Sequence, residues 1–291
     1  MRTLITAMEL ATELSERSDI RVLDVRWKLG DPPGLGEYRA GHIPGAVYVD
    51  LDTELAGHGE PPDGRHPLPG IAALQAAARR WGLTDADTVV VYDDLGGMSA
   101  ARAWWLLRHA GVREVLLLDG ALAAWRRAGL PLATGDEPAP AGTVTLSYGS
   151  LPVLDADAAA RLARTGVLLD ARAAERYRGD TEPIDPRAGH IPGAVSAPTA
   201  ANLTADGFFR PAAELRARFE ALGVSDAGTV RAGTVLASTV GVYCGSGVTA
   251  AHEAAALTIA GFVFALYPGS WSQWSNLPGR PVETGDPHAA A

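Results

Sequence analysis

Cysteine is almost missing from this sequence, because Cys244 is the only one among 291 residues. A single thiol excludes an internal disulfide and a thiolate-rich metal site. Cys244 is therefore either a small buried apolar side chain or a reactive nucleophile.

Long hydrophobic runs and an excess of basic charge are also missing. No stretch is apolar for long enough to predict a membrane span, and residues 1–19 lack the apolar block of a signal peptide. The net charge of −9 argues against nucleic acid or an anionic membrane surface as the main partner. We therefore expect a soluble, cytoplasmic protein with no nucleic-acid or membrane partner.

An internal repeat organises what is present. The segment RAGHIPGAV occurs at 39–47 and again at 187–195. Two further pairs of segments match in the same order, 89–111 with 240–261 and 116–135 with 265–285. The chain is a tandem duplication, and its length fits two ordinary domains. We predict an N-terminal domain over 1–135, a Pro- and Gly-rich linker over 136–149, and a C-terminal domain over 150–291.

Strand-like and helix-like segments alternate within each copy. Short β-branched runs such as 88–92 (TVVVY) are separated by stretches with helical spacing, such as 71–83 and 212–224. This alternation predicts an α/β fold in which each domain has a parallel β-sheet flanked by helices on both faces. Ligands bind such sheets where strands end and helices begin, and Cys244 directly follows the run VGVY at 240–243.

The loop that begins at Cys244 reads Cys-Gly-Ser-Gly-Val-Thr. We expect it to curl so that backbone N–H groups point at the sulfur, with Thr249 capping the following helix. The helix N-terminus adds positive potential, so the loop is suited to a thiolate or persulfide anion. A merely buried cysteine would not require the flanking glycines, and we therefore favour a nucleophile.

The first copy offers an internal control. Asp93 stands at the position of Cys244 and is followed by Asp-Leu-Gly-Gly. A carboxylate in an anion-binding loop fills it with its own charge. We therefore predict that the first domain is catalytically inactive.

These motifs resemble a known family. The repeated GHIPGA, the CGSGVTA loop and the terminal GSWSQW are similar to tandem-domain rhodaneses, which are sulfurtransferases, from about Val22 to Gly285. The neutral loop is closest to the 3-mercaptopyruvate sulfurtransferase branch, since the thiosulfate branch typically has basic residues after the cysteine. The resemblance implies substrate contacts from the loop residues, namely Gly245, Gly247, Val248 and Thr249.

The resemblance also implies that two arginines hold the carboxylate of the substrate. They correspond to Arg176 and Arg187, and arginine suits a carboxylate because its donors form a fork. Arg176 has no counterpart in the first copy, whereas Arg187 is matched by Arg39, so a structural role is equally open for Arg187. The wider spacing between the two leaves Arg178 as a substitute.

The resemblance to the 3-mercaptopyruvate sulfurtransferase branch also implies a serine, a histidine and an aspartate near the thiol. Ser246, His66 and Asp52 fit these positions, and they would relay a proton to the departing enolate. The alternative is an exposed loop histidine and a surface aspartate. His42 and His190 recur in both copies, as do Asp24 and Asp170, so we expect structural roles for these four.

The predicted reaction is transfer of a sulfane sulfur from 3-mercaptopyruvate through a Cys244 persulfide to cyanide or to a thiol acceptor such as thioredoxin. It needs no metal or organic cofactor. The alternatives are a thiosulfate:cyanide sulfurtransferase and a non-enzymatic sulfur carrier or binding module. A phosphatase is disfavoured because Thr249 stands where that loop needs an arginine. The extra segment 227–239 is either an extended loop or a local duplication.

Overall fold

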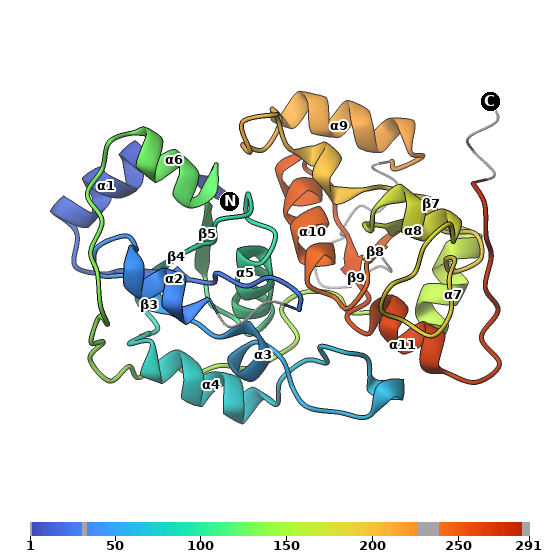
Figure 1. The fold of residues 1–291 in the computed structure, drawn as a ribbon, viewed down its shortest axis with the longest axis horizontal. Coiled ribbons are helices and arrows are strands. Elements are labelled where there is room, and N and C mark those ends of the chain that lie inside the picture. Colours follow the sequence, from blue (N-terminus) through green and yellow to red (C-terminus); the bar gives the residue numbers. More distant parts are fainter. Residues whose placement is uncertain (1, 31–33, 226–238, 287–291) are drawn as a thin grey trace. The chain divides into compact units, whose positions relative to one another are not determined.

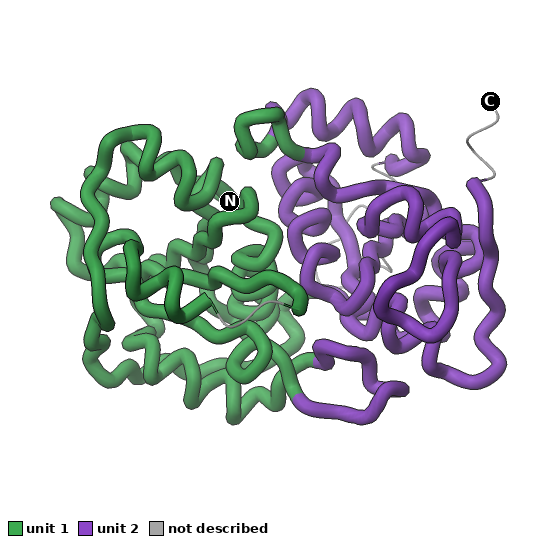
Figure 2. Tube along the Cα trace, viewed as in Figure 1, with its two compact units in different colours: residues 1–57, 68–151, 203–209 green, residues 58–67, 152–202, 210–291 purple. Residues whose placement is uncertain are grey.

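The computed structural model describes residues 2–30, 34–225 and 239–286. The chain forms two compact units, shown in Figure 2. Unit 1 comprises residues 1–57, 68–151 and 203–209, and unit 2 comprises residues 58–67, 152–202 and 210–291. The extra segment 227–239 falls almost wholly outside the described residues.

Unit 1 is built on a five-stranded parallel sheet (Figure 1) with the order β1-β5-β4-β2-β3. Its strands are β1 (Leu4–Ile5), β2 (Ile20–Asp24), β3 (Val47–Tyr48), β4 (Thr88–Tyr92) and β5 (Glu114–Leu118). Its helices are α1 (Ala7–Glu16), α2 (Leu35–Ala40), α3 (Leu51–Glu54), α4 (Ile71–Arg80), α5 (Ala100–His109) and α6 (Ala121–Arg127).

Unit 2 repeats this plan on a four-stranded parallel sheet with the order β7-β6-β8-β9. Its strands are β6 (Val167–Asp170), β7 (Val195–Ser196), β8 (Val240–Tyr243) and β9 (Ala265–Leu266). Its helices are α7 (Ala156–Thr165), α8 (Ala174–Arg178), α9 (Ala212–Ala221), α10 (Thr249–Ile259) and α11 (Ser270–Asn276), with two short 3₁₀ helices, η1 (Pro61–Asp63) and η2 (Thr199–Asn202).

The burial of the two central strands, β4 and β8, explains why each is a continuous apolar run in the sequence. All five residues of β4 and all four of β8 are buried. Successive side chains of a strand point to opposite faces, so both faces of each sheet are covered by helices. The predicted fold class is confirmed.

A buried ion pair recurs beside the central strand of each unit. Asp24 pairs with Arg26 at 2.7 Å, and Asp170 pairs with Arg172 at 2.6 Å. In unit 1 the hydroxyl of Tyr92, the last residue of β4, also donates to Asp24. Both aspartates therefore act in the scaffold, as their repetition predicted.

The two histidines of the repeated GHIPGA segment lie in equivalent surroundings. The Nδ1 atoms of His42 and His190 lie 2.8 Å from the carbonyl oxygens of Tyr38 and Tyr177, respectively, and each ring stacks on that tyrosine. Each histidine also forms an antiparallel bridge to the segment that follows the last helix of its copy. The structural role expected for this pair is confirmed.

The division into units differs from the predicted domain bounds at two short arms. Residues 58–67 precede α4 in the first copy but pack in unit 2, whereas residues 203–209 precede α9 in the second copy but pack in unit 1. The stretch predicted as a linker, 136–149, packs as part of unit 1, where Val144 and Leu146 are buried. No helix among the described residues is long and apolar enough to cross a membrane.

Candidate active site

Cys244 directly follows β8 and begins the turn into α10. Its side chain is 1% exposed. The N–H group of Gly247 donates to the sulfur at 3.2 Å, and Gly247 has a φ of +79°, a conformation that favours glycine. The loop therefore curls back on the sulfur, and the N–H of Gly247 makes one of the several contacts that the sequence predicted.

The first turn of α11 holds this loop from the other side. The N–H groups of Trp271 and Ser272 donate to the carbonyl oxygens of Cys244 and Gly245 at 2.9 and 2.8 Å. The hydroxyl of Ser270 accepts from the N–H of Cys244 at 3.1 Å. These hydrogen bonds fix the backbone on which the thiol is carried.

One detail of the loop prediction is wrong. Helix α10 begins at Thr249, its N-cap residue is Val248, and no side chain caps it. Thr249 is already helical, so its hydroxyl does not serve as the cap. The orientation of the loop comes from its glycines and from α11.

Two guanidinium groups lie over Gly245. A Cβ atom placed on Gly245 would lie 3.4 Å from Nη1 of Arg176 and 3.5 Å from Nη2 of Arg65. Arg176 belongs to α8, and Arg65 belongs to the 58–67 arm. The residue after the thiol is therefore in contact distance of two cations that the loop itself does not contain.

Two carboxylates hold these arginines. Arg176 Nη2 lies 2.6 Å from Glu182 Oε1 and 3.3 Å from Asp185 Oδ2, while Arg65 Nη1 lies 2.9 Å from Asp185 Oδ1. Glu182 also lies 3.4 Å from Arg172, which pairs with Asp170. The cluster carries three positive and three negative groups, so it is pre-organised without a large net charge.

The other two arginines named from the sequence lie elsewhere in unit 2. Arg187 donates to four backbone carbonyls, those of Trp274, Ser275, Leu277 and Arg280. The Arg178 side chain is 38% exposed and pairs with Asp180 at 2.7 Å. These contacts favour the structural alternative for Arg187 and a surface role for Arg178.

The structure brings two members of the expected triad together. Nδ1 of His66 lies 2.7 Å from Oγ of Ser246, and both side chains are buried. Asp52 lies in unit 1, where its Oδ2 accepts a hydrogen bond from the Trp27 indole at 2.9 Å. Participation of Asp52 in the triad stays a prediction.

The matching loop of unit 1 is closed around its own carboxylate. Asp93 is fully buried and accepts four backbone N–H groups at 2.8 to 3.0 Å, from Leu95, Gly97, Ser99 and Ala100. Burial raises the pKa of the Asp93 carboxyl, and the four N–H donors oppose that shift. The expectation that a carboxylate fills this loop is confirmed.

Comparison with known proteins agrees with this duplicated geometry. The model of the rhodanese-like domain matches twice, at residues 6–128 and 155–277. The chain belongs to the rhodanese family. The sequence resemblance is therefore confirmed for both copies.

Several relatives of this rhodanese extend over nearly its full length. It is 47% identical over 289 residues to a Pseudomonas aeruginosa protein provisionally named 3-mercaptopyruvate sulfurtransferase, covering 97% of this chain and 98% of the relative. It is 45% identical over 292 residues to a Mycobacterium tuberculosis protein provisionally named thiosulfate sulfurtransferase SseB, covering 98% of each. The crystal structure of SseA from Escherichia coli matches with a TM-score of 0.80 at 32% identity, over 93% of this chain and 99% of that one.

Sequence reasoning missed three residues of this rhodanese site. Arg65 stands beside His66, and Glu182 and Asp185 lie in the insertion that separates ERYRG from RAGHIPG in the second copy alone. An insertion found only in the copy with the thiol was the available signal. Among the described residues, no group of three or more His, Cys, Asp or Glu side chains is placed to hold a metal ion.

Proposed function

We propose that this sulfurtransferase takes sulfur from 3-mercaptopyruvate and carries it as a persulfide on Cys244. The Cys244 thiolate forms a bond to the sulfur of the donor, and the carbon–sulfur bond breaks with its electron pair going to carbon. The carbon fragment leaves as the enolate of pyruvate and takes up a proton. The single observation that carries the proposal is the pair of guanidinium groups, from Arg65 and Arg176, over the residue next to the thiol.

The arginine pair supports a carboxylate-bearing donor. Guanidinium groups match a carboxylate through two parallel hydrogen bonds, and Glu182 and Asp185 hold both arginines in place before substrate arrives. Because these two carboxylates offset the two cations, the site attracts a dianion such as thiosulfate less than two unpaired arginines would. The balance favours mercaptopyruvate, whose single charge lies at its far end.

Ser246 and His66 are proposed to deliver the proton to the enolate. Their hydrogen bond of 2.7 Å supports a relay in which the histidine gives a proton through the hydroxyl. Asp52 is proposed to orient the histidine. Gly245, Gly247, Val248 and Thr249 would then surround the reacting sulfur as the walls of the loop.

The second half-reaction needs a nucleophilic acceptor. Its thiolate, or cyanide in an assay, attacks the outer sulfur of the persulfide and releases the Cys244 thiolate. A dithiol protein such as thioredoxin fits this chemistry. Because the reaction requires a free thiol, we propose that the enzyme works in the cytoplasm, where thiols are kept reduced.

A donor panel with product identification tests this function. We expect mercaptopyruvate to give pyruvate with a higher kcat/KM than thiosulfate gives sulfite. The intact mass should rise by one sulfur on exposure to donor and fall again with cyanide or dithiol. A higher kcat/KM for thiosulfate, or a persulfide that never turns over, would contradict the proposal.

Thiosulfate:cyanide sulfur transfer is the second candidate. The name of the Mycobacterium tuberculosis relative favours it, and so do the two guanidinium groups, which could face a sulfite leaving group. The same donor panel separates the two, because the products differ.

A further inference from the structure

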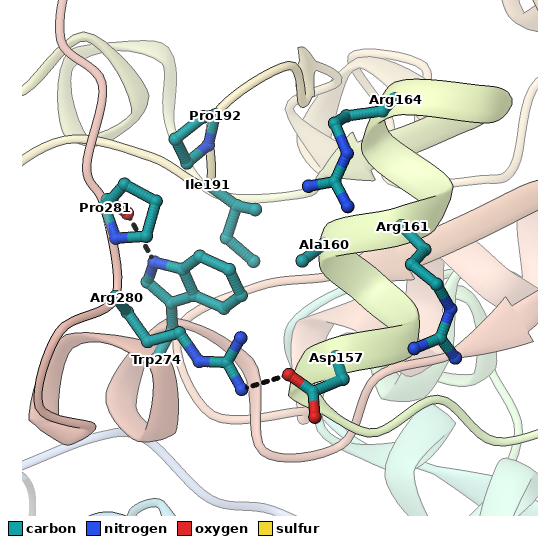
Figure 3. Close-up of a pocket in the computed structure, with 9 residues that line it drawn as sticks. All are labelled: Asp157, Ala160, Arg161, Arg164, Ile191, Pro192, Trp274, Arg280 and Pro281. Carbon is teal, nitrogen blue, oxygen red and sulfur yellow. Dashed lines mark hydrogen bonds and ion pairs between the residues drawn. The ribbon is translucent and has the colours of Figure 1, made fainter.

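Unit 2 has a hollow that is lined by none of the residues described around Cys244. This cavity lies beside α7 (Figure 3) and has a volume of about 320 Å³. One wall is formed by α7, and the opposite side is formed by the Ile191–Pro192 turn, Trp274 and the Arg280–Pro281 segment. Its size lies at the lower end of the range for small-molecule sites.

The rim of this cavity is cationic. Arg161 and Arg164 lie one turn apart on α7, and within the described part of the chain neither guanidinium has a hydrogen bond or ion pair. The third arginine, Arg280, is neutralised by Asp157 at 2.7 Å. Figure 3 shows the Arg164 guanidinium turned toward the hollow and the Arg161 guanidinium on the other side of α7. The lining thus carries two unpaired positive charges in a protein whose net charge is −9.

The floor of the cavity is apolar. The Trp274 side chain is 1% exposed, and its indole N–H already donates to the Pro281 carbonyl at 2.9 Å. The guanidinium of Arg280 lies 4.9 Å from the centre of that ring. Ile191 is fully buried as well, so the apolar surface left to a ligand is mainly that of Pro192 and Pro281.

The first copy shows that the scaffold does not require these arginines. Helices α1 and α7 begin after the equivalent caps Thr6 and Asp155, so Arg161 and Arg164 correspond to Thr12 and Ser15. No charged side chain stands at either position in the first copy.

Arg280 also has no charged counterpart in the first copy. Trp125 donates to the Pro131 carbonyl as Trp274 does to that of Pro281, so Arg280 corresponds to Leu130. Leu130 packs against the apolar core of unit 1. The positive charge is therefore a property of the second copy alone.

We propose that this cavity binds an organic phosphate monoester. A phosphate monoester carries a charge of about −1.5 to −2 at neutral pH, which the two free arginines complement. A guanidinium such as that of Arg164 matches phosphate oxygens in paired hydrogen bonds, and Pro192 and Pro281 offer apolar contact to the organic substituent. The inference does not depend on the donor proposed for Cys244.

Calorimetric titration with phenyl phosphate tests this site in the full-length protein. We expect binding to the wild type, at least tenfold weaker binding to Arg161→Gln/Arg164→Gln, and unchanged sulfur transfer by that variant. The matched control is Arg113→Gln/Arg126→Gln, which removes the same charge from exposed positions of unit 1 and should bind normally. Inorganic phosphate should bind more weakly because it lacks the apolar group.

A second variant separates this site from the one at Cys244. Arg176→Ala should bind phenyl phosphate as the wild type does. Loss of binding in Arg176→Ala with retention in Arg161→Gln/Arg164→Gln would place the anion over Gly245 and overturn the proposal. Absence of binding to the wild type, or equal affinity for inorganic phosphate, would overturn it as well.

Discussion

The loops after β4 and β8 are two versions of one anion-binding turn. Each begins at the end of the central strand, and each has a glycine with positive φ three residues on, Gly96 at +71° and Gly247 at +79°. In unit 1 the turn closes on the Asp93 carboxylate, whereas in unit 2 it curls around the Cys244 sulfur. The fold therefore supplies the turn, and the residue at its first position decides whether the anion is built in or formed by reaction.

The arms that complete the two units differ in chemistry. The 58–67 arm brings Arg65 and His66 to the loop of Cys244, while the 203–209 arm places Leu203 against Gly96 and Phe208 against Gly120 in unit 1. One arm is polar and faces a reactive group, and the other is apolar and covers a closed turn. An active copy thus needs both a thiol and an arm with functional groups.

Replacing the thiol should have the largest effect. Cys244→Asp converts the second turn into the first, and we expect sulfur transfer to fall by about 10³-fold or more, because the nucleophile is lost. Donor consumption and intact mass measure this. The reverse exchange, Asp93→Cys in the Cys244→Asp background, should not restore turnover, since the arm there is apolar; restored turnover would break the comparison.

Removing an arginine over Gly245 should have the next largest effect. Arg176→Ala should lower kcat/KM for mercaptopyruvate because a contact to the substrate carboxylate is lost. We expect the loss of transition-state stabilisation to be about 2 to 5 kcal/mol. Discharge of the persulfide to cyanide should change far less, since pyruvate has left by then. Stopped-flow measurement of each half-reaction separates them, with Arg178→Ala as the matched surface control; equal damage to both would indicate a structural arginine.

The placement of the 58–67 arm can be tested by a substitution at Gly64. Gly64 has a φ of +90°, and a Cβ there would lie 2.9 Å from the Gly269 carbonyl oxygen, whereas Gly207 of the other arm has a φ of +80° and open space around it. We expect Gly64→Ala to lower kcat/KM by about tenfold by displacing Arg65 and His66, and Gly207→Ala to leave activity intact. Equal activity of the two variants would mean that the arm does not position the site.

The hydrogen bonds of the closed turn to Asp93 should affect the stability of unit 1 rather than the activity of the enzyme. Asp93→Asn puts an amide N–H₂ opposite backbone N–H donors, so we expect the free energy of unfolding of unit 1 to fall by about 1 to 3 kcal/mol. Urea unfolding followed by fluorescence measures the change. Unaltered unfolding would show that the four N–H contacts to Asp93 are not stabilising.

The smallest expected effect concerns donor choice. Glu182→Gln leaves one more positive charge beside Gly245, so the ratio of kcat/KM for thiosulfate to that for mercaptopyruvate should rise by about threefold, less than 1 kcal/mol. Asp180→Asn removes a surface charge next to Arg178 and serves as the control. If the ratio is the same in both variants, donor preference does not depend on the charge balance of the site.

The parts of the site that a repeat reveals could be predicted from the sequence. Alternating segments gave the sheets, and the match between Asp93 and Cys244 located the two turns. The arginine pair could not be predicted in full, because Arg65 reaches the thiol loop through an arm of the first copy that packs in the second unit. The cap on α10 was mispredicted because Thr249 has the right side chain one residue too late.

The arm at 203–209 also bears on how the chain is made. Unit 1 consists of residues up to 151 together with this later arm, whose Phe208 packs on Gly120. On the ribosome, about fifty residues of the second copy must follow residue 151 before the arm is synthesised, which at ordinary elongation rates of roughly 5 to 20 residues per second takes several seconds. During that interval the nascent first copy exposes the apolar surface that the arm later covers, so its final folding step waits for translation of the second copy.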